Sequence, residues 1–174
     1  MYLNLKHPFT LIVAWPSSCG KSTFVIRLLE CREPLCDIAF ENIVCCHSEN
    51  NALHHLKKVS LVKGVSDFEI PESIPTLIVL DDLMDNAYST KASQSFTKGS
   101  HQRNISLVLI TQILFHQGPS SRDIYLNSNY IVVFKNPRAK TQIVQLSHKY
   151  TFKVLLLFTR RTSKCVNILM PIFY

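Results

Sequence analysis

The stretch that decides the fold is Thr10–Leu29, TLIVAWPSSCGKSTFVIRLL. Its first part, Leu11–Ala14, is an uninterrupted apolar run, which is typical of a strand buried on both faces of a parallel sheet. A tight polar segment, Pro16–Ser22, follows it, and the apolar residues of Thr23–Leu29 recur at helical spacing. The sequence therefore predicts a strand, a loop and a helix in direct succession.

The loop nearly matches the Walker A pattern G-x-x-x-x-G-K-[ST]. In such a loop, backbone N–H groups and the helix N-terminus point at one place and favour an anion there. Gly20 lets the backbone pass close to phosphate, Lys21 reaches the β- and γ-phosphates, and the Ser22 hydroxyl coordinates Mg²⁺. The alternative is a Gly-Lys-Ser in an ordinary turn. The nucleotide-binding residues predicted here are Pro16, Ser17, Ser18, Cys19, Gly20, Lys21, Ser22 and Thr23.

One position departs from the Walker A pattern. Trp15 stands where the first glycine is expected, at the point where the strand turns into the loop. This entry position touches phosphate less closely than Gly20 does, yet an indole must fit there. Nucleotide hydrolysis therefore depends on how the loop accommodates Trp15.

A second apolar run, Thr76–Asp82, ends in two carboxylates: TLIVLDD. Open α/β sheets bind ligands outside the carboxyl ends of their strands, so both carboxylates are expected near the nucleotide. This is a Walker B pattern, in which Asp81 holds Mg²⁺ opposite Ser22 and Asp82 orients and deprotonates the attacking water. The alternative is an acidic pair that caps the next helix.

A third buried strand is predicted at Ile105–Ile110, and it ends in Thr111-Gln112. A polar side chain at the tip of a strand beside Walker B can touch the γ-phosphate or the attacking water. Gln112 is therefore a candidate catalytic residue. The alternative is that Thr111-Gln112 forms a simple turn at the strand end.

The rest of the chain continues the alternation of strands and helices. Residues 60–73 are predicted to be irregular because Gly64 and Pro71 punctuate them. Phe115–Arg122 is predicted to be a loop at the same sheet edge, and Phe152–Phe158 is ambiguous between helix and strand. Further strands are predicted at Asn42–His47, Tyr130–Phe134 and Val166–Met170, and further helices at Asn50–Lys58, Asp85–Phe96 and Ala139–Lys149.

Length and composition indicate a folded domain. The chain has 174 residues, 47% of them hydrophobic, and only four glycines, which excludes disorder and fibrous repeats. We therefore expect one domain over residues 1–174, with a short or divergent part after about residue 150. No window approaches a membrane span, and the first residues lack the layout of a signal peptide. An intracellular, non-secreted protein with no membrane partner is expected.

The six cysteines favour reduced intracellular thiols over a disulfide framework, because most of them lie in strand- or helix-like segments. Cys45-Cys46-His47 with His54-His55 raises the alternative of a metal site. The spacing of a zinc site is missing, which strongly disfavours that alternative.

Charge is divided unevenly along the chain. Residues 1–97 hold 8 Lys and Arg against 11 Asp and Glu, so −3. Residues 98–174 hold 11 Lys and Arg against Asp123 alone, so +10. A basic half beside an acidic one suggests a polyanionic partner, nucleic acid before membrane, although a solvated basic face is the alternative.

With these segments placed, the chain resembles the genome-packaging ATPases of the HerA/FtsK superfamily. The closest type is that of Polinton (Maverick) elements, adintoviruses and poxvirus-like large DNA viruses. Coverage runs from about Pro8 to Gln145. The matching stretches are PSSCGKSTF (16–24), LIVLDDLMD (77–85), FTKGSHQRNISLVLITQILFHQG (96–118) and SRDIYLNSNYIVVFKNPR (121–138).

The resemblance implies a P-loop NTPase three-layer sandwich of the additional-strand (ASCE) type, with a mostly parallel central sheet. It also implies a homo-oligomeric ring that hydrolyses ATP with Mg²⁺ and moves double-stranded DNA into a capsid, with capsid proteins as partners. The protein would then work at a viral assembly site or in the host nucleus or cytoplasm. Arg103 and Arg122 are candidates for an arginine finger on a neighbour's ATP, and Arg122 is favoured.

Two other functions stay open. The first is a divergent or decaying P-loop protein that binds nucleotide with little hydrolysis and serves as an interaction module, which Trp15 favours. The second is another P-loop NTPase, such as a helicase or a kinase. A kinase requires an arginine-bearing lid and an acceptor site, and neither is recognisable in the sequence.

Overall fold

The computed structural model describes residues 4–14, 21–47, 59–64, 73–81, 104–112, 121–134, 153–157 and 169–171. The described helices are α1 (Lys21–Glu30), α2 (Arg32–Leu35) and α6 (Ser121–Leu126). The described strands are β1 (Thr10–Ala14), β2 (Asn42–His47), β3 (Ser60–Lys63), β4 (Thr76–Asp81), β5 (Ile105–Thr111), β6 (Tyr130–Phe134), β7 (Lys153–Leu157) and β8 (Leu169–Pro171).

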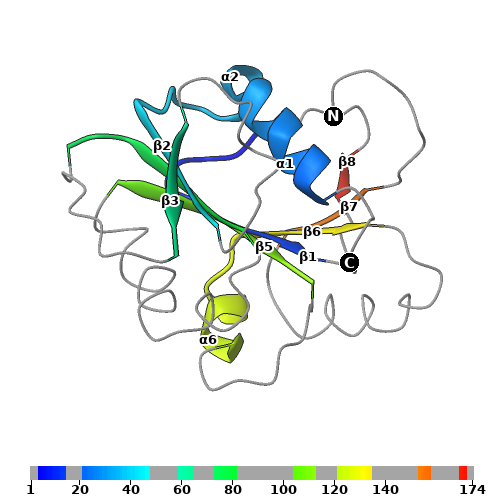
Figure 1. Cartoon of the computed structure of the whole chain (residues 1–174). Coiled ribbons are helices and arrows are strands. Elements are labelled where there is room, and N and C mark those ends of the chain that lie inside the picture. Colours follow the sequence, from blue (N-terminus) through cyan, green and yellow to red (C-terminus); the bar gives the residue numbers. More distant parts are fainter. Residues whose placement is uncertain are drawn as a thin grey trace.

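All of these strands belong to one sheet, in the order β3-β2-β4-β5-β1-β6-β7-β8. Every pairing from β3 to β7 is parallel, and only β8 is antiparallel to its neighbour. Helices α1 and α2 lie on one face of the sheet and α6 lies on the other (Figure 1). The predicted α/β class with a mostly parallel sheet is therefore confirmed.

The middle of the sheet forms the core. Strands β1 and β5 are buried along their whole length. Their residues are mostly Val, Ile and Leu, as parallel strands covered on both faces require. Helix α1 adds one apolar side to the same core through Phe24, Val25, Leu28 and Leu29.

Helix α1 begins at Lys21, two residues before the predicted start, and ends at Glu30. A short second helix, α2, follows directly after Cys31 and contains Pro34 in its first turn. Proline is tolerated in the first turn of a helix because the N–H groups there have no partner within the helix.

The residues before β1 tie the helix pair to the sheet. The Leu5 N–H donates to the Leu35 carbonyl at the end of α2 (2.8 Å), and the Asp37 N–H donates to the Leu5 carbonyl (3.2 Å). Four residues later, the Phe9 carbonyl accepts from the Leu107 N–H of β5 (2.8 Å). The segment before β1 is therefore hydrogen-bonded to the end of α2 through Leu5 and to β5 through Phe9.

A polar cluster around His7 strengthens this connection. The imidazole Nε2 lies 2.6 Å from the Asn104 Oδ1, which can only accept, so Nε2 carries the proton and donates. Nδ1 then accepts from the Ser106 hydroxyl at 2.7 Å. The Ser106 oxygen in turn accepts from the Phe9 N–H at 3.1 Å, so one buried hydroxyl serves two partners.

The amino ends of β1 and β6 are joined in a similar way. The Thr10 N–H donates to the Asn129 Oδ1 (2.8 Å), and the Thr10 hydroxyl donates to the Asn127 carbonyl (2.7 Å). The Asn129 N–H donates back to the Thr10 carbonyl (3.0 Å). These bonds fix β6 on the side of β1 opposite to β5.

Two predictions about local structure are wrong. The range 60–73 is not irregular throughout, because Ser60–Lys63 form β3 by parallel pairing with β2. The predicted loop Phe115–Arg122 ends inside α6, which includes its last two residues. This short helix is finished by side chains: Asn127 donates to the Asp123 carbonyl and Ser128 to the Ile124 carbonyl, each at 2.7 Å.

Near the C-terminus, the ambiguous range Phe152–Phe158 contains a strand, β7, which pairs with β6. The strand predicted at Val166–Met170 corresponds to β8, which covers Leu169–Pro171. The predicted helices Asn50–Lys58, Asp85–Phe96 and Ala139–Lys149 lie outside the described residues.

Candidate nucleotide site

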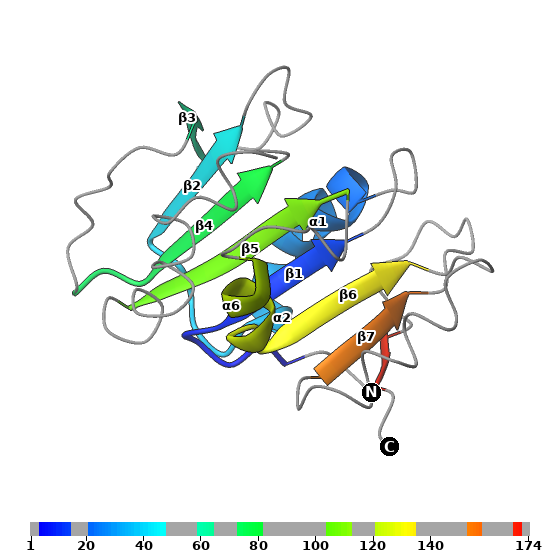
Figure 2. The ribbon, with the colours of Figure 1, turned by 90° about the horizontal axis from the view of Figure 1, so that it is seen from below.

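The carboxyl ends of the parallel strands meet along one edge of the sheet, where the arrowheads lie in Figure 2. At this edge Ala14 of β1 is in register with Thr111 of β5. Asp81 of β4 is in register with Ile110, one residue before Thr111. Because side chains alternate along a strand, Asp81 and Thr111 leave the sheet on opposite faces. The two polar strand ends are therefore neighbours that face different sides.

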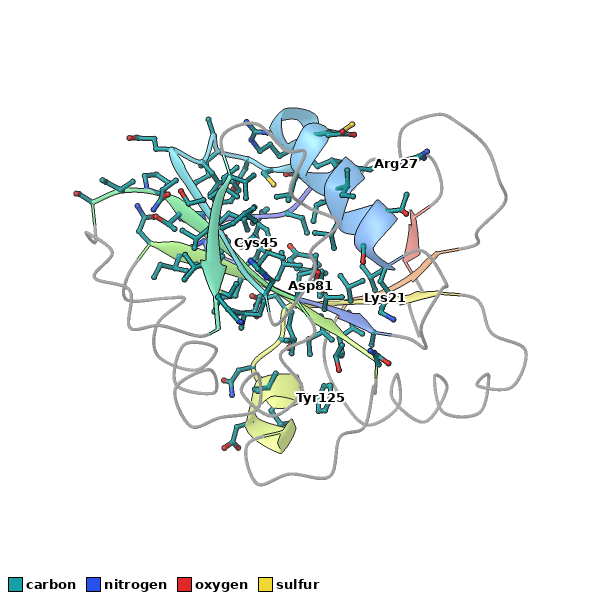
Figure 3. All side chains as sticks on the ribbon, in the orientation of Figure 1. Lys21, Arg27, Cys45, Asp81 and Tyr125 are labelled. Atoms are coloured by element: carbon teal, nitrogen blue, oxygen red, sulfur yellow. The ribbon has the colours of Figure 1, made fainter. Side chains whose placement is uncertain are left out.

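Lys21 is the first residue of α1, the helix that follows β1. Its side chain is only 9% exposed, which is unusual for a lysine. Figure 3 shows Lys21 at the end of α1 nearer the strand tips, whereas Arg27 of the same helix points away from the sheet. The positive end of the helix dipole and a lysine therefore lie together beside the tip of β1.

The other described residues of the predicted site lie at the same edge or next to it. Ser22 is half-buried and Thr23 is exposed, both in the first turn of α1. Asp81 and Gln112 are half-buried, at the end of β4 and directly after β5. The predicted site residues Pro16–Gly20 and Asp82 lie outside the described residues.

Trp15 and Arg103 also lie outside the described residues. Arg122 lies in α6, on the face of the sheet opposite to α1 (Figure 1). Helix α6 leads into the amino end of β6, so the structure does not bring Arg122 to the edge that holds Lys21 and Asp81. A role for Arg122 at the site of a neighbouring subunit stays a prediction.

The donors suit a hard cation. Ser22 offers a hydroxyl oxygen and Asp81 a carboxylate, and oxygen ligands of this kind are the ones that Mg²⁺ takes, together with substrate phosphates and water. Across the described part of the chain, no group of three or more His, Cys, Asp and Glu side chains is placed to hold a metal ion. By the chemistry of their oxygens, Ser22 and Asp81 are suited to a Mg²⁺ ion that also takes phosphate and water ligands.

Sequence reasoning missed one residue of this edge. His47 ends β2 and is in register with Asp81 of β4. From the sequence, His47 is a candidate only together with Cys45 and Cys46, as a disfavoured zinc ligand. The available signal was a polar residue at the end of an apolar strand, the same signal that identified Asp81.

The described cysteines lie in the hydrophobic core or pack against it. Cys31, Cys36, Cys45 and Cys46 are reduced and not disulfide-bonded. Burial, and then the neighbouring Cys45, raises the pKa of Cys46 to about 12. Burial, and then Asp37, raises the pKa of Cys36 to about 11, against a smaller opposing effect of Arg32. A thiol that keeps its proton at neutral pH is a poor nucleophile and a poor metal ligand.

In comparisons with known proteins, neither a family model nor a curated protein matches the chain. The described helices are all too short or too polar to cross a lipid bilayer.

Proposed function

We propose that the chain is an ATPase of the additional-strand P-loop type, which binds ATP and Mg²⁺ at the carboxyl edge of its sheet. The observation that carries the proposal is the order of three strands. Strand β5 lies between β1, which leads to the Gly-Lys-Ser loop, and β4, which ends in Asp81. The inserted strand itself ends in Thr111 and is followed by Gln112. This order supports a P-loop sandwich of the additional-strand type.

Each residue has a distinct task in this proposal. Lys21 and the N–H groups at the start of α1 meet the terminal phosphates of ATP. Ser22 and Asp81 hold Mg²⁺, which neutralises charge on the phosphates when it is bound. Asp82 accepts a proton from the attacking water and Gln112 orients that water.

In this proposal the chain forms a homo-oligomeric ring. The ring uses ATP hydrolysis to move double-stranded DNA and packages a viral or transposon genome into a capsid. The support is the resemblance of residues 96–138 to packaging ATPases and the +10 balance of residues 98–174. A basic surface binds the DNA backbone without reading its sequence. In a ring, Arg122 would act on the ATP of a neighbouring subunit.

A second candidate function is nucleotide binding with little hydrolysis, and Trp15 favours it. An indole at the entry to the loop can shift the backbone N–H groups away from the phosphate. A displacement of about 1 Å is enough to cost ~100-fold in rate. Under this alternative, Trp15→Gly would raise the rate of ATP hydrolysis.

The deciding measurement is steady-state ATP hydrolysis by the full chain with and without double-stranded DNA. We expect turnover that DNA stimulates and that Lys21→Ala removes. Turnover that is low in the wild type and rises in Trp15→Gly would favour the second candidate. If the wild type fails to bind ATP at all, both candidates are wrong.

A further inference from the structure

His47, the last residue of β2, lies beside Asp81, the last residue of β4, at the carboxyl ends of these strands. In the parallel pairing of β2 with β4, His47 and Asp81 are in-register partners. In-register residues of parallel strands project from the same face of the sheet. Neighbouring strands lie about 4.8 Å apart, so an imidazole and a carboxylate at these two positions are within reach of each other.

The in-register neighbour of Asp81 on the other strand has an apolar side chain. On the β5 side the in-register residue is Ile110, which is buried and apolar. The four residues of β2 before His47 are buried and apolar as well: Ile43, Val44, Cys45 and Cys46. His47 is thus the polar in-register neighbour of the carboxylate.

The backbone around His47 is fixed up to the end of the strand. The His47 carbonyl accepts a hydrogen bond from the Gly64 N–H at 2.9 Å, just after Lys63 of β3 pairs with His47. His47 is therefore held between two strands and is half-buried. A side chain with a fixed base and limited exposure can orient a neighbour with little loss of entropy.

We propose that His47 is a positioning residue for Asp81, a proposal that rests on the function proposed above. One imidazole N–H donates to one carboxylate oxygen of Asp81 and leaves the second oxygen for Mg²⁺. Outer-shell partners of this kind fix the orientation of a metal ligand, and their loss typically costs 10- to 100-fold in metal affinity or activity.

The test is a Mg²⁺ titration of the binding of a fluorescent, non-hydrolysable ATP analogue to the full chain. His47→Leu removes the donor, and we expect the half-saturating Mg²⁺ concentration to rise roughly tenfold. Affinity for the analogue in excess EDTA stays unchanged, because the Lys21 end of α1 is intact. His47→Gln keeps an N–H donor, and it recovers most of the Mg²⁺ affinity.

His7→Gln is the matched control. His7 is also a half-buried histidine, but it lies at the amino end of the sheet, where it contacts Asn104 and Ser106. Its substitution leaves the Mg²⁺ dependence unchanged. A His47→Leu protein with the wild-type Mg²⁺ dependence overturns the positioning role. If the leucine variant does not fold, His47→Ala replaces it, and a wild-type Mg²⁺ dependence of the alanine variant overturns the role in the same way.

The failure of the proposed function has a different signature. In that case the wild type does not bind the analogue, or Lys21→Ala binds it as tightly as the wild type does. Binding that Lys21→Ala strongly weakens, together with a Mg²⁺ dependence that His47 does not affect, overturns only the positioning role.

Discussion

Thr111, the last residue of β5, lies in register with Ala14, the last residue of β1. Both residues are buried. The end of β5 therefore lies directly beside the end of β1, the strand that precedes the Gly-Lys-Ser segment. Under the proposed function, a change at the nucleotide would have a short route through this contact to Gln112, the residue after Thr111.

Substitution of Gln112 by alanine tests that route. We expect turnover to fall roughly 100-fold, the usual cost of removing one aligned polar group from a transition state, with ATP affinity unchanged. Steady-state hydrolysis and nucleotide titration measure the two quantities. Asn104→Ala, just before the other end of β5, serves as the control and keeps normal turnover. Wild-type turnover in Gln112→Ala would show that Thr111-Gln112 is only a strand-end turn.

Substitutions of Lys21 and Arg27 test whether Lys21 binds the phosphates of ATP. Both residues lie on α1, but only Lys21 is near the strand tips (Figure 3). We expect Lys21→Ala to weaken ATP binding by roughly two orders of magnitude, because charged hydrogen bonds are lost. Arg27→Ala binds ATP normally. A nucleotide titration decides, and equal affinity of the wild type and Lys21→Ala would exclude the P-loop assignment.

Much of the site edge is predictable from local sequence, because the strands that build it are continuous apolar runs. Thr76–Asp81 and Ile105–Thr111 are examples, and each ends in a polar residue that marks the carboxyl edge. In contrast, β3 has four residues, with exposed ends at Ser60 and Lys63, and it becomes a strand only by pairing with β2. Its sequence carries no local signal of that pairing.

The register between strands is also invisible in the sequence. His47 precedes Asp81 by more than thirty residues, and they become neighbours only because β2 lies beside β4. The end of α6 is not visible in the sequence either. Side chains of Asn127 and Ser128 donate to carbonyls of its last turn, so the helix stays short. Such tertiary and capping effects outweigh periodicity in short elements.

The buried thiols predict a loss of stability at alkaline pH. An unfolded thiol titrates near 9.0, whereas burial raises the pKa of Cys46 to about 12 in the folded chain. Above pH 9 the unfolded state loses a proton that the folded state keeps, so the free energy of unfolding falls between about 9 and 12. Urea unfolding at a series of pH values measures this fall. Cys46→Ala makes the dependence shallower, and an identical slope in both proteins would contradict the prediction.

Ser106→Ala tests the cluster at the amino end of the sheet. The change removes the hydroxyl that bonds His7 and leaves the buried Phe9 N–H without its acceptor. We expect the free energy of unfolding to drop by about 1–3 kcal/mol. Ser60→Ala, at an exposed serine of β3, is the control and changes stability by less than about 0.5 kcal/mol. Denaturant unfolding of both variants gives the comparison, and equal stabilities would mean that the cluster contributes little.

The central position of β1 has a consequence for synthesis of the chain. Its two neighbours are β5 and β6, and contacts such as His7 with Ser106 join residues 99 positions apart. At translation speeds of about 5–20 residues per second, the apolar strand Leu11–Ala14 waits roughly 5–20 seconds on the ribosome for its first partner. We expect nascent chains stalled before β5 to crosslink to chaperones. Full-length chains are released from the chaperones. Stalled chains that do not crosslink to chaperones would show that the strand is shielded in another way.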